Sequence, residues 1–166
     1  MRMRFAICFA VLITAAAGSQ AAAQESKTVT RLQTDGSRIA SAVWVGDTLY
    51  VSGQLPSPMT AADAAKGTPA VYGNTQAQSE NTFAKIQTLL KEQGLGMGDI
   101  VMMRVYMAAD PAMGNKLDFA GMNTAFGKYF GTPEQPNKPA RSTVQVAALV
   151  AAGALVEIEV QAARSR

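Results

Sequence analysis

The sequence predicts an α+β domain in which two helices cover one face of a single sheet, in the element order β-β-β-α-β-α-β-β. Three observations predict this class. Two segments, residues 75–93 and 117–130, carry apolar side chains at helical spacing. Short β-prone segments precede, separate and follow them. In this order both helices can cover one face of a single sheet.

The first β segments predict three short strands. Residues 28–32 alternate in polarity and form the first. Residues 40–45 and 48–52 are β-prone, and the Gly46-Asp47 turn between them predicts a hairpin. Residues 56–73 are rich in proline, small and polar residues, which predicts a long mobile loop of the kind that often carries function.

The first helix has the clearest boundaries. Thr75 is a good N-cap, and Gln78 three residues later completes a capping box. Gly94 is placed to end the helix as a C′ glycine. The stripe between these boundaries is expected to lie in the core and consists of Phe83, Ile86, Leu89 and Leu90.

The C-terminal half predicts three more strands and a second helix. Residues 99–107 read as a strand that is mostly apolar on both faces, as expected for a strand covered on both sides. The second helix runs from residue 117 or 118 to 130, before Gly131 and Pro133. Residues 142–149 and 155–163 read as the last two strands, joined as a hairpin through a turn at Ala151-Ala152-Gly153.

The N-terminus has the three parts of a secretory signal peptide. Arg2 and Arg4 precede an uncharged apolar run over residues 5–17, and the small residues Ala21-Ala22-Ala23 follow. The predicted domains are a signal peptide over residues 1–23 and one domain over residues 24–166. A retained anchor is the weaker reading, because the run is shorter than the roughly 20 residues that a span needs. We therefore expect a periplasmic or secreted protein that has no membrane partner after signal removal.

The composition excludes several kinds of site. The chain has no histidine, and its one cysteine, Cys8, lies in the predicted signal peptide. Residues 24–166 can therefore form no Ser-His-Asp triad, no cysteine nucleophile and no ordinary zinc site. We expect no metal and no cofactor. Without Arg2 and Arg4, 13 of the 15 basic residues remain against 12 acidic ones, a charge of +1, which does not favour a nucleic-acid partner.

The predicted C-terminal hairpin places polar side chains on its helix-free face. These residues are Arg141, Thr143, Gln145, Glu157 and Glu159. A guanidinium can bind a carboxylate through two parallel hydrogen bonds, and a glutamate can activate water as a general base. From the pattern alone, a solvated face with weak surface ion pairs is the commoner explanation. A subunit interface is a third interpretation, because the helix-free face needs cover.

Several short motifs occur in a fixed order along the chain. They are Ser52-Gly53-Gln54-Leu55-Pro56, Tyr72-Gly73-Asn74-Thr75-Gln76, Gly98-Asp99-Ile100-Val101, Asp118-Phe119-Ala120-Gly121-Met122-Asn123, Pro139-Ala140-Arg141-Ser142-Thr143-Val144 and Val156-Glu157-Ile158-Glu159. This ordered set resembles the Rid family of reactive-intermediate deaminases, also called YjgF-like proteins. The resemblance covers about residues 28–164.

The resemblance implies a chorismate-mutase-like fold and a homotrimer with three clefts between subunits. It also implies hydrolysis of enamine or imine intermediates, such as 2-aminoacrylate, to a 2-keto acid and ammonia. By matching position, Arg141 would bind the substrate carboxylate and Glu157 would position the hydrolytic water. Backbone groups around Ser52 and Gly53 would contact the ligand, and Asn123 would line the cleft from the neighbouring subunit.

Three positions depart from the pattern of the family. Thr143 stands where many members have cysteine and would line the same pocket, and Ile39 replaces a tyrosine found in deaminating members. The turn before Leu155 is one residue longer than in the family.

An alternative function is a non-catalytic trimeric module that binds a small carboxylate metabolite. A third is a holdase-like role that uses an adaptable surface built from some of the nine methionines.

Overall fold

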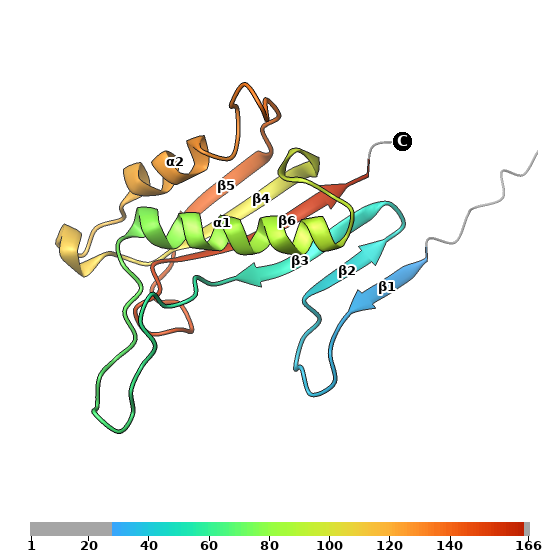
Figure 1. Ribbon diagram of the computed structural model, residues 1–166. Helices are drawn as coiled ribbons and strands as arrows, with labels where there is room; N and C mark the ends of the chain where they lie inside the picture. The colour runs from blue at the N-terminus through green and yellow to red at the C-terminus, as the bar shows by residue number, and fades with distance from the viewer. Residues whose placement is uncertain (1–27, 165–166) are drawn as a thin grey trace, which may run out of the picture.

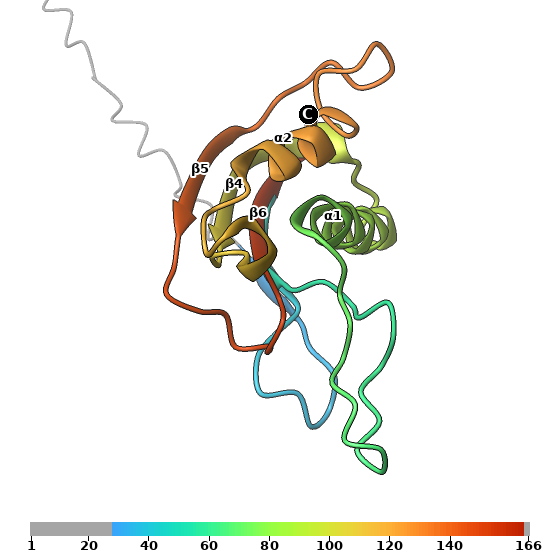
Figure 2. The ribbon, with the colours of Figure 1, turned by 90° about the vertical axis from the view of Figure 1, so that its left-hand side faces the viewer.

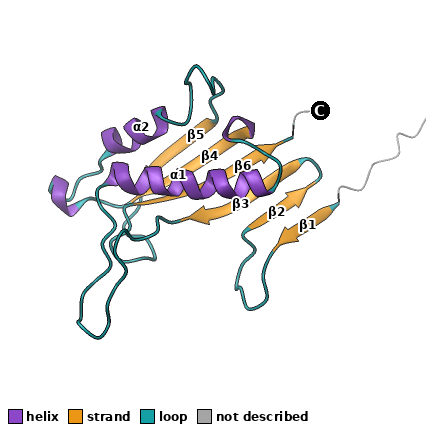
Figure 3. Cartoon of the chain, viewed as in Figure 1, coloured by secondary structure: helices purple, strands orange, loops and turns teal. Residues whose placement is uncertain are grey.

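The computed structural model describes residues 28–164, so the predicted signal peptide lies outside the described residues. A six-stranded sheet carries two α-helices on one face, which confirms the predicted fold class and element order (Figures 1 and 3). The strands are β1 (Val29–Leu32), β2 (Ala42–Val45), β3 (Thr48–Gln54), β4 (Ile100–Met107), β5 (Ala140–Gln145) and β6 (Val156–Ala163). The helices are α1 (Thr75–Glu92) and α2 (Phe119–Gly127), with 3₁₀ turns η1 (Met97–Asp99) and η2 (Pro111–Met113).

The order of strands across the sheet is β1-β2-β3-β6-β4-β5. The predicted hairpin between the last two strands is therefore wrong. Strand β6 inserts between β3 and β4 and is antiparallel to both, whereas β5 pairs in parallel with β4. The burial patterns give the physical reason. Strand β6 alternates between buried and half-buried residues along its length, as a central strand does, whereas β5 has no fully buried residue and lies at the edge.

This topology also corrects the predicted grouping of polar side chains. Met103 and Val105 of β4 are buried beneath the helices, and they pair with Arg141 and Thr143 of β5. Directly paired residues point to the same face of a sheet. Arg141 and Thr143 therefore lie on the helix face, and Gln145 follows them on the same face.

The two glutamates of β6 lie on the opposite, helix-free face. Glu157 pairs with Tyr106, and Glu159 pairs with Arg104. Arg104 Nη1 donates to Glu159 Oε1 at 2.6 Å, so this carboxylate already has a cationic partner. Figure 2 shows the sheet nearly edge-on, with both helices on one side of it.

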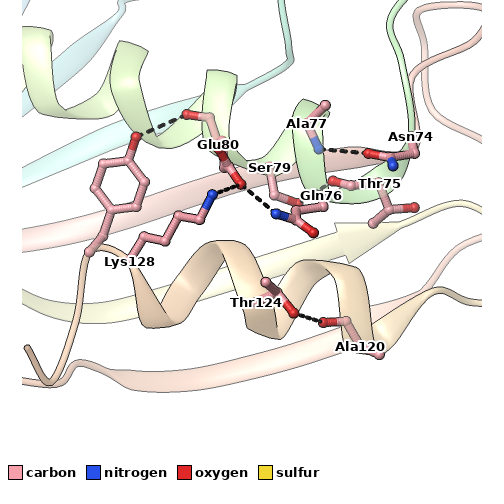
Figure 4. Close-up of polar contacts among 10 residues, drawn as sticks. Asn74, Thr75, Gln76, Ala77, Ser79, Glu80, Ala120, Thr124 and Lys128 are labelled. Atoms are coloured by element: carbon pink, nitrogen blue, oxygen red, sulfur yellow. Dashed lines mark hydrogen bonds and ion pairs between the residues drawn. The ribbon is translucent and has the colours of Figure 1, made fainter.

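Helix α1 begins one residue earlier than predicted. Asn74, not Thr75, is the N-cap, and its Oδ1 accepts a hydrogen bond from the Ala77 amide at 2.9 Å (Figure 4). Thr75 is already helical and buried. The other end is as predicted, because Gly94 has a positive φ of 71° and the Leu95 amide donates back to the Leu90 carbonyl at 2.9 Å.

The two helices pack through an aromatic cluster around the buried Phe83 of α1. Its ring centroid lies 5.1 to 6.4 Å from the rings of Phe126, Tyr129 and Phe130. Helix α2 ends at Gly127, earlier than predicted, and the last two of these aromatic residues follow it.

An ion pair at the surface also links the two helices. Lys128 Nζ donates to Glu80 Oε1 at 2.6 Å, and the hydrogen bond to this ammonium lowers the pKa of the Glu80 carboxyl (Figure 4). Together with the aromatic cluster, this contact joins α2 to α1.

The long loop over residues 56–73 folds back on itself. Thr60 pairs with Val71 and Asp63 with Thr68 through isolated antiparallel bridges. Lys66 and Asp63 form an exposed ion pair at 2.9 Å near the tip. In Figure 1 this segment projects as a finger below the sheet, before α1.

Replacing Gln78 with alanine is expected to destabilise the fold by about 3 kcal/mol, because buried partners would lose their hydrogen bonds. The buried Gln78 amide donates to the Gly73 and Gly153 carbonyls at 3.0 and 3.1 Å, and its Oε1 accepts from the Leu155 amide at 2.7 Å. Urea unfolding followed by circular dichroism measures the change. The control is Gln87→Ala on the exposed side of the same helix, and equal loss in the two variants would contradict this role.

Candidate functional site

Arg141 lies near the start of edge strand β5 and extends across helix α2. Its Nη2 donates to Asn123 Oδ1 at 2.8 Å, and its guanidinium carbon lies 4.4 Å from the centroid of the Phe126 ring. The exposed Phe119 ring is 5.7 Å away on the same helix. Burial lowers the pKa of Arg141, although a guanidinium stays charged at neutral pH. Neutral groups therefore hold the cation in a partly desolvated place.

The Arg141 guanidinium has no carboxylate partner within the described residues. The ion pairs recorded over residues 28–164 join other side chains, and Glu159 is engaged by Arg104 on the far face. The guanidinium contacts neutral groups, and Nη1 also donates weakly to the Met122 sulfur at 3.6 Å. A half-buried cation held in this way can still form hydrogen bonds with an anion. This part of the site can therefore bind a small carboxylate.

Thr143 adds an unpartnered hydroxyl beside this cation. Its Oγ1 is buried and has no hydrogen-bond partner. It lies two residues along β5 from Arg141, on the same face. A buried hydroxyl without a partner is rare and can be satisfied by a ligand or by water. We call Asn123, Arg141 and Thr143 the β5 half-site.

Glu157 belongs to a second group of residues on the helix-free face. Its carboxylate lies directly over Gly53, so closely that a Cβ atom at that position would collide with Glu157 Oε1. Gly53 stands where the pairing of β3 with β6 shifts register, between Val51 and Gln54. The missing side chain therefore provides the space that the carboxylate occupies. We call Ser52, Gly53 and Glu157 the β3 half-site.

Ser52 has a structural part in the β3 half-site. Its amide donates to the Ser41 carbonyl at 3.0 Å, and its hydroxyl donates to the Ala40 carbonyl at 2.7 Å. The carbonyl of the neighbouring Ile39 accepts from the Ser37 hydroxyl at 2.7 Å. These bonds hold the segment before β2 in place, and the Ile39 side chain stays 68% exposed.

The two half-sites lie on opposite faces of the sheet. A single copy of the chain therefore brings Asn123, Arg141 and Thr143 together and Ser52, Gly53 and Glu157 together, but does not bring Arg141 to Glu157. Cavities of about 470 and 430 Å³ elsewhere in the chain are lined by residues of neither half-site. A ligand that touches both charges needs a second copy of the chain.

The sequence interpretation missed the aromatic side of the β5 half-site. It assigned Phe126 no role in the site, yet its ring faces the guanidinium as well as the ring of Phe83. The proximity of Asn123 to Phe126 on one helix was the available signal.

Over residues 28–164 no three Asp, Glu, His or Cys side chains cluster as metal ligands would, and no helix is long and apolar enough to span a membrane.

Replacing Asn123 with aspartate is expected to weaken pyruvate binding about tenfold, because a carboxylate 2.8 Å from Arg141 would compete with the ligand for the same cation. The side chain keeps its size, so the melting temperature should not fall. Calorimetric titration with pyruvate measures the effect. Asn123→Ala removes the oxygen without adding charge and should change affinity less; equal losses in the two variants would contradict this arrangement.

Comparison with known proteins agrees with this architecture. The family model described as endoribonuclease L-PSP matches residues 31–164. A RutC family protein of Saccharolobus solfataricus is 35% identical over 124 residues, which cover 74% of this chain and 84% of that protein. A 2-iminobutanoate/2-iminopropanoate deaminase of Dermatophagoides farinae is 30% identical over 72% of this chain and 80% of its own length.

A solved structure extends the match to three dimensions. The Mycobacterium tuberculosis member of the YjgF/YER057c/UK114 family superposes with a TM-score of 0.59 at 25% identity, over 82% of this chain and all of that one. The matched region includes every strand and helix from β2 to β6 together with both half-sites. The chain therefore belongs to the Rid family, the YjgF/RutC group of proteins.

Proposed function

We propose that the protein is an exported homotrimer that hydrolyses enamine or imine intermediates of small amino acids to 2-keto acids and ammonia. The observation that carries the proposal is the Arg141 guanidinium, which is positioned by Asn123 and Phe126 and has no carboxylate partner among the described residues. The name of the Dermatophagoides farinae relative supports the reaction class. Arg141 binds the substrate carboxylate, and the Thr143 hydroxyl lines the same pocket.

The position of the two half-sites supports an assembly of several copies. Arg141 and Glu157 lie on opposite faces, so one subunit supplies the carboxylate-binding cation and its neighbour supplies the carboxylate that positions water. The helix-free face also carries exposed apolar side chains, including Tyr50 and Val144, that a second copy would cover. Closed rings of identical subunits satisfy every such interface, and a ring of three gives three clefts.

The chemistry requires proton transfer and orientation. An enamine first tautomerises to the imine by taking a proton on its terminal carbon and losing one from nitrogen. Water then adds to the C=N carbon while Glu157 accepts a proton from it, and the imine nitrogen is protonated. In the resulting carbinolamine the hydroxyl proton passes to nitrogen, the C–N bond breaks to release ammonia, and the C=O bond forms. No electrons are transferred between reactants, so carboxylate, guanidinium and hydroxyl groups supply what the reaction needs.

Export is proposed from the N-terminal sequence, which has the order of a signal peptide. The product of residues 24–166 would then act in the periplasm or outside the cell. N-terminal sequencing of the protein recovered from cell fractions tests this. A start near residue 24 in the exported fraction supports it, and an intact Met1 in the cytosolic fraction would contradict it.

The test of the activity is an imine released in situ by an amino-acid oxidase. The purified protein should accelerate the appearance of 2-keto acid and ammonia above the rate in buffer, with semicarbazide trapping used to report the remaining imine. A folded protein that gives no acceleration, and whose Arg141→Ala variant behaves identically, would remove the proposal.

A non-catalytic trimeric module that binds a small carboxylate is the second candidate. The exposed Ile39 and the unpartnered Thr143 hydroxyl favour it, because both stand where the family resemblance leads us to expect other residues. Such a module would bind pyruvate saturably in calorimetry, lose that binding in Arg141→Ala, and show no turnover of imine. Turnover that depends on Glu157 excludes this alternative.

A further inference from the structure

A groove on the helix face, far along the sheet from β5, has the features of a second ligand site. Its volume is about 430 Å³, which is in the range of small-molecule sites. One wall is helix α1, and the other is formed by the ends of β1 and β3. In Figure 1, α1 crosses in front of the sheet near β3 and β6, and β2 and β1 lie to the right, past the C-terminal end of the helix. We call this cavity the α1 groove.

The floor of the α1 groove is apolar, and two amide side chains in its wall have hydrogen-bonding groups that are not used by any described residue. Leu32 and Leu89 line the groove and pack against the hydrophobic core. Gln93 Oε1 accepts from the Trp44 indole at 3.2 Å, which leaves its NH₂ group to donate. Gln54 Nε2 donates to the Ser52 carbonyl at 3.0 Å, which leaves its carbonyl oxygen to accept. The groove thus offers one amide donor and one amide acceptor beside an apolar surface.

Two opposite charges line the same groove without neutralising each other. Lys85 and Glu92 lie on one stripe of α1, seven residues apart, so about 10 Å separates them along the helix axis. That is beyond the reach of the i,i+4 pairs that helices form. Among the described residues neither side chain has an ion-pair partner. Lys85 Nζ donates to the Leu55 carbonyl at 2.7 Å, which fixes its position and leaves two protons.

The position of Glu92 favours a cation at its end of the groove. It is the last residue of α1, where the helix dipole is negative and a carboxylate adds to that potential. Arg164 donates to the Gln93 carbonyl at 3.4 Å and stacks on the Trp44 ring, and no ion pair joins it to Glu92 among the described residues. The groove therefore has a cationic centre at Lys85 and an anionic centre at Glu92.

We propose that the α1 groove binds a short zwitterionic peptide of about three residues. An extended tripeptide spans about 10 Å, which is close to the spacing of Lys85 and Glu92 along the axis of α1. Its carboxylate lies at Lys85 and its ammonium at Glu92, its amides bond with Gln54 and Gln93, and small side chains rest on the apolar floor. A free amino acid carries both charges on one carbon and cannot reach both ends.

Calorimetric titration with tri-alanine tests the site. We expect saturable binding, weakened about tenfold in Lys85→Met and in Glu92→Gln. Two control variants change charges outside the groove: Lys91→Met on the same helix, and Glu134→Gln. Both should bind tri-alanine with the affinity of wild type. Blocking the ligand tests the orientation: Glu92→Gln should not further weaken N-acetyl-tri-alanine, and Lys85→Met should not further weaken tri-alanine amide.

The Arg141→Ala variant separates peptide binding in the α1 groove from the proposed deaminase activity. Arg141→Ala should bind tri-alanine with unchanged affinity, because the groove and the β5 half-site share no residue. Loss of binding in that variant would mean that the peptide occupies the carboxylate site, and the groove proposal would be overturned. Absence of saturable binding to a folded protein, or equal affinity in wild type and the Lys85→Met and Glu92→Gln variants, would overturn it as well.

Discussion

Replacing Arg141 with alanine is expected to lower kcat/KM for imine hydrolysis about 100-fold, because truncating one partner of a desolvated charge pair has effects of that size. The guanidinium is held by Asn123 and Phe126 rather than by a carboxylate, so in the proposed reaction it can pair with the substrate carboxylate. Pyruvate binding, measured by calorimetry, should fall in parallel. Arg141→Lys keeps the charge but loses the planar guanidinium, so its kcat/KM should lie between those of Arg141→Ala and wild type.

The control for Arg141 is Lys116→Met, which removes one exposed positive charge before α2. It should leave kcat/KM and pyruvate affinity within about twofold of wild type, since surface charges act weakly through solvent. If Arg141→Ala retains the affinity of the wild type for pyruvate while remaining folded, the carboxylate is bound elsewhere and the assignment is wrong.

Replacing Glu157 with glutamine is expected to lower kcat by about 100-fold or more with little change in KM, because general-base catalysis contributes effects of this size. The amide fits the space over Gly53 but cannot accept a proton from water. Steady-state rates over a range of imine concentrations separate the two parameters.

Glu159→Gln is the matched control, two residues along β6 on the same face. Its carboxylate is paired with Arg104 and has no role in the proposed reaction. We expect a modest loss of thermal stability and a kcat close to that of wild type. A kcat that falls equally in both glutamate variants would show that charge on this face, rather than the position of Glu157, determines the rate.

Local structure was predictable from the sequence wherever one segment contained its own signals. Gly94 is the C′ glycine after helix α1, as predicted, and the error at the start of the helix was one residue. Asn74 and Thr75 are both suitable N-cap residues, and in the structure Thr75 is buried and Asn74 is the cap. The alternation of β6 correctly placed its two glutamates on the helix-free face. Period-two patterns report which residues of one strand share a face.

The pairing of β5 was not predictable in this way. An alternating pattern does not say which strand lies alongside, and the short connection over residues 146–155 favoured a hairpin. The connection instead crosses β4, so that β5 and β6 lie on opposite sides of that strand. This arrangement puts the two most apolar strands, β4 and β6, in the middle of the sheet, and it depends on contacts between distant parts of the chain. This error put Arg141 and Glu157 on one face, and its correction is what calls for a second subunit.

Subunit complementation tests this central claim most directly. Arg141→Ala and Glu157→Gln proteins, each inactive alone, are mixed in equal amounts, unfolded and refolded together so that subunits exchange. If each site takes Arg141 from one subunit and Glu157 from the next, random assembly restores about one interface in four, and activity should approach a quarter of wild type. Mixed assemblies that show no more activity than the separate variants would contradict the shared site.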